Sequence, residues 1–101
     1  MKLFVWGTML RGECNHSRLV RLGAKFLEVK QIKGITGELY EIPIDGFIEM
    51  ARFEGTANFI HVIVDEYIQR DGTKEAIYMF VESPANNGNS WYKGHKLLNQ
   101  V

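Results

Sequence analysis

Glu54 is the carboxylate of this sequence whose position best suits proton transfer. It stands directly before Gly55, at the end of a short helix predicted over residues 47–53. A carboxylate in a last helical turn faces the negative end of the helix dipole, which disfavours its ionised form. Shielding from water by Phe53 and Phe59 would also raise its pKa. A raised pKa suits a general acid or base near neutral pH; the alternative is an ordinary surface acid, one of twelve acidic residues.

The segment "WGTMLRG", residues 6–12, is the second candidate. It follows an apolar run, and Gly7 permits a ligand to approach the backbone closely. Exposed amides after a strand can hold a carboxylate or a phosphate group. The segment lacks the Gly-Lys-Ser/Thr half of a P-loop, so it gives little support for a nucleotide site. An ordinary strand-ending turn is the alternative.

The remaining candidates have simpler structural explanations. Cys14 and His16 do not suggest a metal site, because the chain has one cysteine and three histidines with no pair at zinc spacing. We therefore expect neither metal binding nor thiol chemistry at these residues. His61 lies on the less apolar face of its predicted strand, where it either lines a cavity or is a hydrogen-bonded structural histidine. The aromatic and histidine side chains of residues 91–95 either close over a ligand or pack the C-terminal segment onto the core.

Alternating apolar residues and turn residues predict the elements that position these groups. The predicted strands cover residues 2–6, 24–29, 35–42, 59–69 and 74–81. The last two form the clearest hairpin, joined by an Asp-Gly turn. A short helix capped by Asn15 or Ser17 precedes Gly23, and the second helix is expected to stop at Gly55. This pattern predicts an α+β fold: a small, mainly antiparallel β-barrel with short flanking helices.

Length and charge narrow the class of protein. The 101 residues predict one domain over residues 1–101, with a core over residues 2–81 and a loop and tail over residues 82–101. The net charge is zero, which argues against a nucleic-acid partner. No apolar run is long enough for a membrane span, and a single cysteine fits a reducing compartment. These features predict a cytoplasmic protein.

Several segments in order resemble the γ-glutamylcyclotransferase-like family. "LFVWGTMLRGECNHSRL" resembles the family's opening strand Phe-Val-Tyr-Gly-Thr-Leu with its Arg-Gly and Asn-His. "ITGELYEI" resembles its Val-x-Gly-Glu-Leu-Tyr strand, and "MARFEG" resembles its Leu-Asp-x-x-Glu-Gly helix end. The strand from Phe59 and "EAIYMFV" resemble its Tyr-x-Arg and Ala-x-x-Tyr strands. The resemblance extends from residue 3 to about residue 81.

The resemblance implies an enzyme that cleaves a γ-glutamyl amine or amide. The substrate's α-amino nitrogen attacks its own γ-carbonyl, which releases an amine and leaves 5-oxoproline, without metal or cofactor. The family's acid/base residue falls on Glu54. The implied substrate-binding residues are Trp6, Gly7, Thr8, Met9, Arg11, Phe59 and His61.

The chain differs from the family pattern at several of these positions. Trp6 and Met9 replace Tyr and Leu of the loop, and Phe59 and His61 replace Tyr and Arg of the strand. Ala51 replaces an Asp in the helix. The changes at residues 51, 59 and 61 favour one alternative, a non-catalytic member of the fold that binds a small ligand or a protein. A further alternative is an interaction module that uses the exposed hairpin over residues 59–81.

Overall fold

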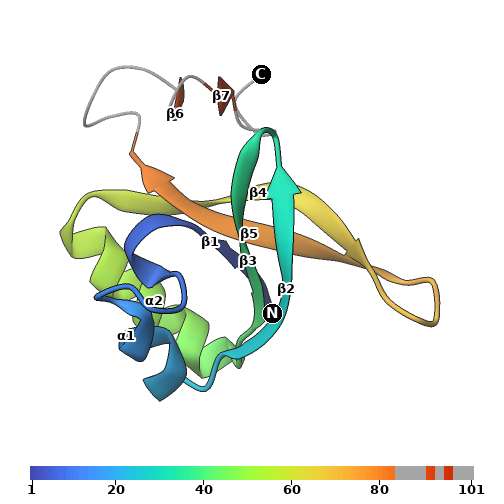
Figure 1. Ribbon diagram of the computed structural model, residues 1–101, viewed down its shortest axis with the longest axis horizontal. Coiled ribbons are helices and arrows are strands. Elements are labelled where there is room, and N and C mark those ends of the chain that lie inside the picture. Colours follow the sequence, from blue (N-terminus) through green and yellow to red (C-terminus); the bar gives the residue numbers. More distant parts are fainter. Residues whose placement is uncertain (84–90, 93–94, 97–101) are drawn as a thin grey trace.

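A five-stranded mixed sheet forms the centre of the protein, and the helices lie against one of its faces (Figure 1). The structure is a computed structural model that describes residues 1–83, 91–92 and 95–96. The strands of the sheet are β1 (Lys2–Val5), β2 (Lys25–Ile32), β3 (Ile35–Glu41), β4 (Phe59–Ile68) and β5 (Lys74–Glu82). The helices are the 3₁₀-helix η1 (Gly7–Met9), α1 (His16–Arg21) and α2 (Ile44–Thr56). The predicted α+β class is confirmed.

The strand order in the sheet is β2-β3-β1-β5-β4. The pairs β1–β3, β2–β3 and β4–β5 are antiparallel, whereas β1 and β5 run parallel. The outer strands are β2 and β4, and no pairing joins them in the described part of the chain. The sheet is therefore open, and the barrel expected from the sequence is not confirmed.

Each face of the sheet carries its own apolar cluster, because side chains alternate along a strand. In β3, Leu39 and Tyr40 belong to different clusters. The helix-covered face holds Leu3, Val5, Leu19, Tyr40, Ile42, Phe47, Met50 and Phe80. The other face holds Phe4, Ile32, Ile35, Leu39, Val62, Val64, Ile77, Met79 and Val81. Alternate residues of the segment 35–42 therefore contribute to opposite faces of the sheet.

Helix α2 is longer than the sequence predicts. It begins directly after Pro43 and continues through Gly55, so the expected stop at Gly55 is wrong. The left-handed conformation that often follows a helix falls instead on Asn58, whose φ is 64°. A cluster of apolar side chains on α2 packs on the sheet, and this packing outweighs the weak helix propensity of one glycine.

Helix α1 packs closely against the start of α2 because Gly46 has no side chain. A Cβ atom at this position would lie 2.3 Å from the carbonyl oxygen of Leu22, at the end of α1. Asn15 stands at the N-cap of α1, as one of the two alternatives predicted, but its side chain does not cap the helix. Gly23 follows α1 with φ of 86°, as expected for a helix stop.

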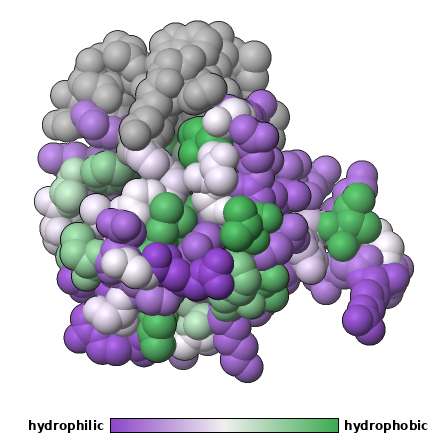
Figure 2. Space-filling model, viewed as in Figure 1, coloured by the Kyte–Doolittle hydropathy of each residue, from purple (hydrophilic) through white to green (hydrophobic). Residues whose placement is uncertain are grey.

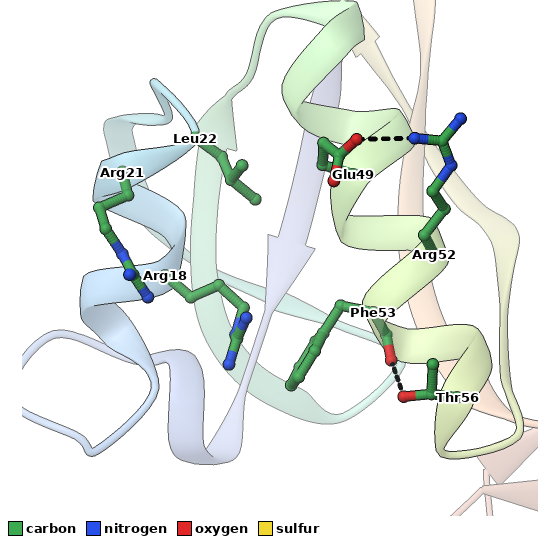
Figure 3. A pocket seen from close by; sticks show the side chains of 7 residues that line it. All are labelled: Arg18, Arg21, Leu22, Glu49, Arg52, Phe53 and Thr56. Atoms are coloured by element: carbon green, nitrogen blue, oxygen red, sulfur yellow. Dashed lines mark hydrogen bonds and ion pairs between the residues drawn. The ribbon is translucent and has the colours of Figure 1, made fainter.

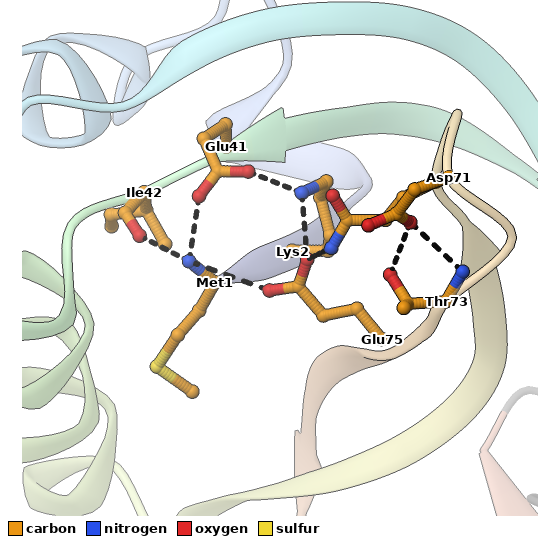
Figure 4. A network of polar contacts seen from close by, with 8 residues as sticks. Met1, Lys2, Glu41, Ile42, Asp71, Thr73 and Glu75 are labelled. Carbon is orange, nitrogen blue, oxygen red and sulfur yellow. Dashed lines mark hydrogen bonds and ion pairs between the residues drawn. The ribbon is translucent and has the colours of Figure 1, made fainter.

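Ion pairs at the start of β1 connect it to both neighbouring strands (Figure 4). The amino group of Met1 contacts Glu41 Oε2 at 2.7 Å and the Ile42 carbonyl oxygen at 2.7 Å. Lys2 Nζ donates to Glu41 and, at 2.9 Å, to Glu75 of β5. Burial lowers the pKa of Lys2, but these partners outweigh it and the pKa lies above its ordinary value. The network fixes the central strand between β3 and β5.

The β4–β5 hairpin extends beyond the body of the molecule (Figure 1). Its turn contains the predicted Asp-Gly pair, with Gly72 at φ of 88°. Apolar side chains are scattered among polar ones on the face drawn in Figure 2. On β4, the exposed apolar side chains include those of Ile60, Ile63 and Ile68. In the described residues, no helix is long and apolar enough to cross a membrane.

Two short strands follow the main sheet, β6 (Trp91–Tyr92) and β7 (His95–Lys96), and pair with each other. The sequence left this segment without an assigned element. The predicted loop "ANNGNS" over residues 85–90 lies outside the described residues, as do the side chains of residues 91–95.

Candidate functional site

A cavity of about 230 Å³ lies where β1 ends, and it brings together two segments far apart in the sequence. Residues 6–9 form one wall directly after β1, and Glu54 enters from α2. The lining residues are Phe4, Val5, Trp6, Gly7, Thr8, Met9, Glu54, Phe59, Met79 and Phe80. The cavity thus brings together Glu54 and the loop at residues 6–9, the two candidates that the sequence indicated separately.

Glu54 is 8% exposed and lies in the last turn of α2. Its carboxylate makes no hydrogen bond or ion pair with any residue that the structure describes. Burial raises its pKa, and the positive charge of Arg18 opposes the rise without cancelling it. The raised pKa predicted from the sequence is confirmed, with desolvation as its main cause. The group is therefore a carboxyl that takes up a proton more readily than an ordinary glutamate.

The loop opposite Glu54 is held by hydrogen bonds from the start of α1. The backbone amide of Asn15 donates to the Thr8 carbonyl oxygen at 2.8 Å, and Asn15 Nδ2 donates to Thr8 Oγ1 at 3.0 Å. His16 Nδ1 lies 3.1 Å from the Met9 carbonyl oxygen. Gly7 has φ of 79°, a conformation that favours glycine. These contacts give the polar stretch after β1 a defined shape, and they explain what Asn15 does in place of capping α1.

A buried carboxylate on β3 anchors the far end of this loop. Glu38 is 8% exposed and accepts two hydrogen bonds from Arg11, from the backbone amide at 3.1 Å and from Nε at 3.0 Å. Tyr40 Oη donates a third at 2.9 Å. Burial alone would raise the pKa of Glu38, but these donors outweigh it and the pKa lies below its ordinary value. Burial and the same carboxylate raise the pKa of Tyr40.

Two of the expected substrate-binding residues do not line the cavity. Arg11 binds Glu38, and its guanidinium carbon lies 3.8 Å from the centre of the Phe26 ring. His61 packs against aromatic rings, with Phe47 at 5.4 Å between ring centroids. A direct role for Arg11 and His61 in ligand binding stays a prediction. Their observed contacts are structural.

The other sequence candidates lie away from this cavity. Phe53, expected to shield Glu54, faces a second cavity between α1 and α2 and is 36% exposed. Cys14 is exposed. Within the described residues, no group of histidine, cysteine and acidic side chains could hold a metal ion.

Strand β5 supplies a part of the cavity wall that the sequence did not indicate. Met79 and Phe80 line the cavity because β5 runs parallel to β1 and lies beside it. Their alternation predicts a strand, but it does not predict the neighbour of that strand. Phe4 and Val5 were expected in the core and also contribute to the wall.

Comparison of the chain with models of protein families, with curated proteins and with solved structures gives no match. The geometry of the cavity and the resemblance of the segments around it are therefore the basis for a functional proposal.

Proposed function

We propose that the protein is a γ-glutamylcyclotransferase-like enzyme in which Glu54 is the acid/base residue. The observation that carries the proposal is that a buried carboxyl of raised pKa, with no bonding partner among the described residues, faces the same cavity as residues 6–9. These are the two segments in which the sequence resembles the functional motifs of the family. The proposal extends to the fold: the five-stranded sheet would correspond to the barrel-like sheet of the family.

The size of the cavity supports a small substrate. At about 230 Å³ it lies below the range of about 300–1,000 Å³ typical for drug-sized ligands. A γ-glutamyl group needs one anion-binding site for its α-carboxylate. The family resemblance assigns that site to the backbone amides of Gly7, Thr8 and Met9, and all three residues line the cavity.

The proposed reaction needs proton transfer and a folded substrate. The α-amino nitrogen forms a bond to the γ-carbonyl carbon, and the bond from that carbon to the departing nitrogen breaks. Two protons move from the attacking nitrogen to the departing amine, and a carboxyl of raised pKa can accept and release each in turn. Holding the glutamyl chain folded against the cavity wall adds proximity.

Incubation of the full chain with a panel of γ-glutamyl amines tests the proposal by the appearance of 5-oxoproline. We expect product from the wild type and a rate at least about 100-fold lower for Glu54→Gln, the usual effect of losing a general acid or base. Glu66→Gln is the matched control because Glu66 is exposed on β4 and outside the cavity. Absence of product from the wild type, or equal rates for Glu54→Gln and Glu66→Gln, would overturn the proposal.

A further inference from the structure

A second and larger cavity, of about 470 Å³, lies between α1 and α2 (Figure 3). It shares no lining residue with the Glu54 cavity. Its lining residues are Arg18, Arg21, Leu22, Glu49, Arg52, Phe53 and Thr56. We call this cavity the arginine groove. Its volume falls within the range of about 300–1,000 Å³ that holds small organic ligands.

The arginine groove has an excess of positive charge in a chain whose net charge is zero. Of its charged groups, Glu49 pairs with Arg52 at 2.7 Å, and Figure 3 shows this pair on α2. Arg18 and Arg21 extend from α1, and neither forms an ion pair with a carboxylate in the described residues. Two guanidinium groups that line the groove are therefore not paired with a carboxylate of the described residues, although the charge of Arg18 also acts on Glu54.

Arg18 is held in position before any ligand binds. Its guanidinium carbon lies 3.4 Å from the centre of the Phe53 ring, a stacked arrangement that orients the plane of the group. Its Nε is buried and has no hydrogen-bond partner among the described residues. A buried N–H without an acceptor costs free energy, so this arginine has hydrogen-bonding capacity that no described residue uses.

We propose that the arginine groove binds the phosphate group of a small organic molecule. A phosphate dianion has the charge and the number of oxygens to engage two guanidinium groups at once, whereas a single carboxylate is matched by one arginine. Phe53 and Leu22 offer apolar surface for the organic part of the ligand. This inference does not depend on the reaction proposed for Glu54.

Calorimetric titration of the full chain at fixed ionic strength tests the inference, with phenyl phosphate, inorganic phosphate and benzoate as probes. We expect phenyl phosphate to bind most tightly, because it alone offers both the dianion and an apolar body. Arg18→Gln and Arg21→Gln should each weaken it at least about tenfold, the effect of losing one charge-assisted hydrogen bond. Arg70→Gln, which removes an exposed arginine in the β4–β5 turn, should leave its affinity unchanged.

Three results would overturn the inference. The first is no binding of phenyl phosphate by the wild type. The second is equal weakening by Arg70→Gln and Arg21→Gln, which would indicate general electrostatic attraction. The third is inorganic phosphate or benzoate binding as tightly as phenyl phosphate. Circular dichroism checks that each variant folds, and Arg21→Gln carries the test if loss of the Arg18 stacking unfolds the protein, because Arg21 is exposed.

Discussion

Arg11 donates two hydrogen bonds to Glu38, one from its backbone amide and one from its side chain, so one carboxylate fixes both the path of the loop and the direction of the arginine. Because Glu38 lies on β3 and Arg11 follows the loop at residues 6–9, this contact sets the distance between the sheet and one wall of the Glu54 cavity. The contact has a role in both stability and site geometry.

Glu38→Gln should lower the free energy of unfolding by about 1–3 kcal/mol at neutral pH. The new side-chain amide has one NH₂ group in place of an acceptor oxygen, and this group would face a donor of Arg11 or Tyr40 without forming a hydrogen bond. The negative charge that strengthens the remaining bonds would also be lost. Urea denaturation measures the loss. Tyr40→Phe is the control that removes only one of the three donors, and it should cost less.

The effect of Glu38 should depend on pH. Its pKa is lowered in the folded protein, so its contribution is present above the unfolded value of about 4.3 and is lost as the pH falls through the folded pKa. The difference between wild type and Glu38→Gln should therefore shrink in acid. A difference that stays constant from neutral pH to about pH 3 would contradict the ionised contact.

Glu54→Gln should have the opposite effect and stabilise the protein at neutral pH by about 1 kcal/mol. Burial raises the pKa of Glu54, so its favourable contribution is present below about pH 4.3 and is lost as the pH rises through the folded pKa. Denaturation experiments at pH 7 and at about pH 4 should show that the variant is more stable than the wild type only at pH 7. A variant less stable than wild type at pH 7 would indicate that the carboxylate is well solvated or paired.

Gly7, in the cavity wall, and Gly55, next to Glu54 in the chain, should respond to substitution by alanine with stability changes of opposite sign. Gly7 has φ of 79°, so Gly7→Ala forces a left-handed backbone on a residue with a side chain and should cost about 1–2 kcal/mol. Gly55 lies inside α2 with open space around it, so Gly55→Ala should gain about 0.5–1 kcal/mol. Neither added Cβ meets an atom within 4 Å. Thermal midpoints of the two variants test the prediction, and a shift in the same direction would refute it.

Arg18→Gln should raise the pKa of Glu54, because the guanidinium of Arg18 is the charge that opposes the effect of burial. Titration of the Glu54 side-chain carbon by NMR would measure the shift, and Arg70→Gln should leave the pKa unchanged. Saturation of the arginine groove with phenyl phosphate should also raise the pKa of Glu54, because a bound anion offsets the charge of Arg18. A lower pKa in either experiment would contradict this coupling.

The parts of the fold that depend on local pattern were predictable from the sequence. Alternation defined the β4–β5 hairpin, and Phe47 and Met50 at helical spacing indicated a helix that leads up to Glu54. The predicted end of that helix was wrong, because packing on the sheet, rather than the single residue Gly55, decides how far α2 continues. The barrel was not confirmed because closure depends on long-range pairing of outer strands, which local alternation does not encode.

The two sites differ in how far the sequence indicated them. Glu54 and the loop at residues 6–9 stood out because each has a local signal: a carboxylate at a helix end, and a glycine after an apolar strand. The arginine groove was not predicted, because Arg18 and Arg52 lie on different helices and line one cavity only when Gly46 lets α1 approach α2. The spacing of Arg18 and Arg21, one helical turn apart, was the only available signal.

The parallel pairing of β1 with β5 has a consequence for synthesis of the protein. A nascent chain that has reached only β4 contains Glu54 and the loop after β1, but one edge of β1 and part of the cavity wall still await Met79 and Phe80. Such a chain presents an open strand edge on the ribosome, where intermolecular pairing competes with folding. The pocket can therefore assemble only after β5 has been translated.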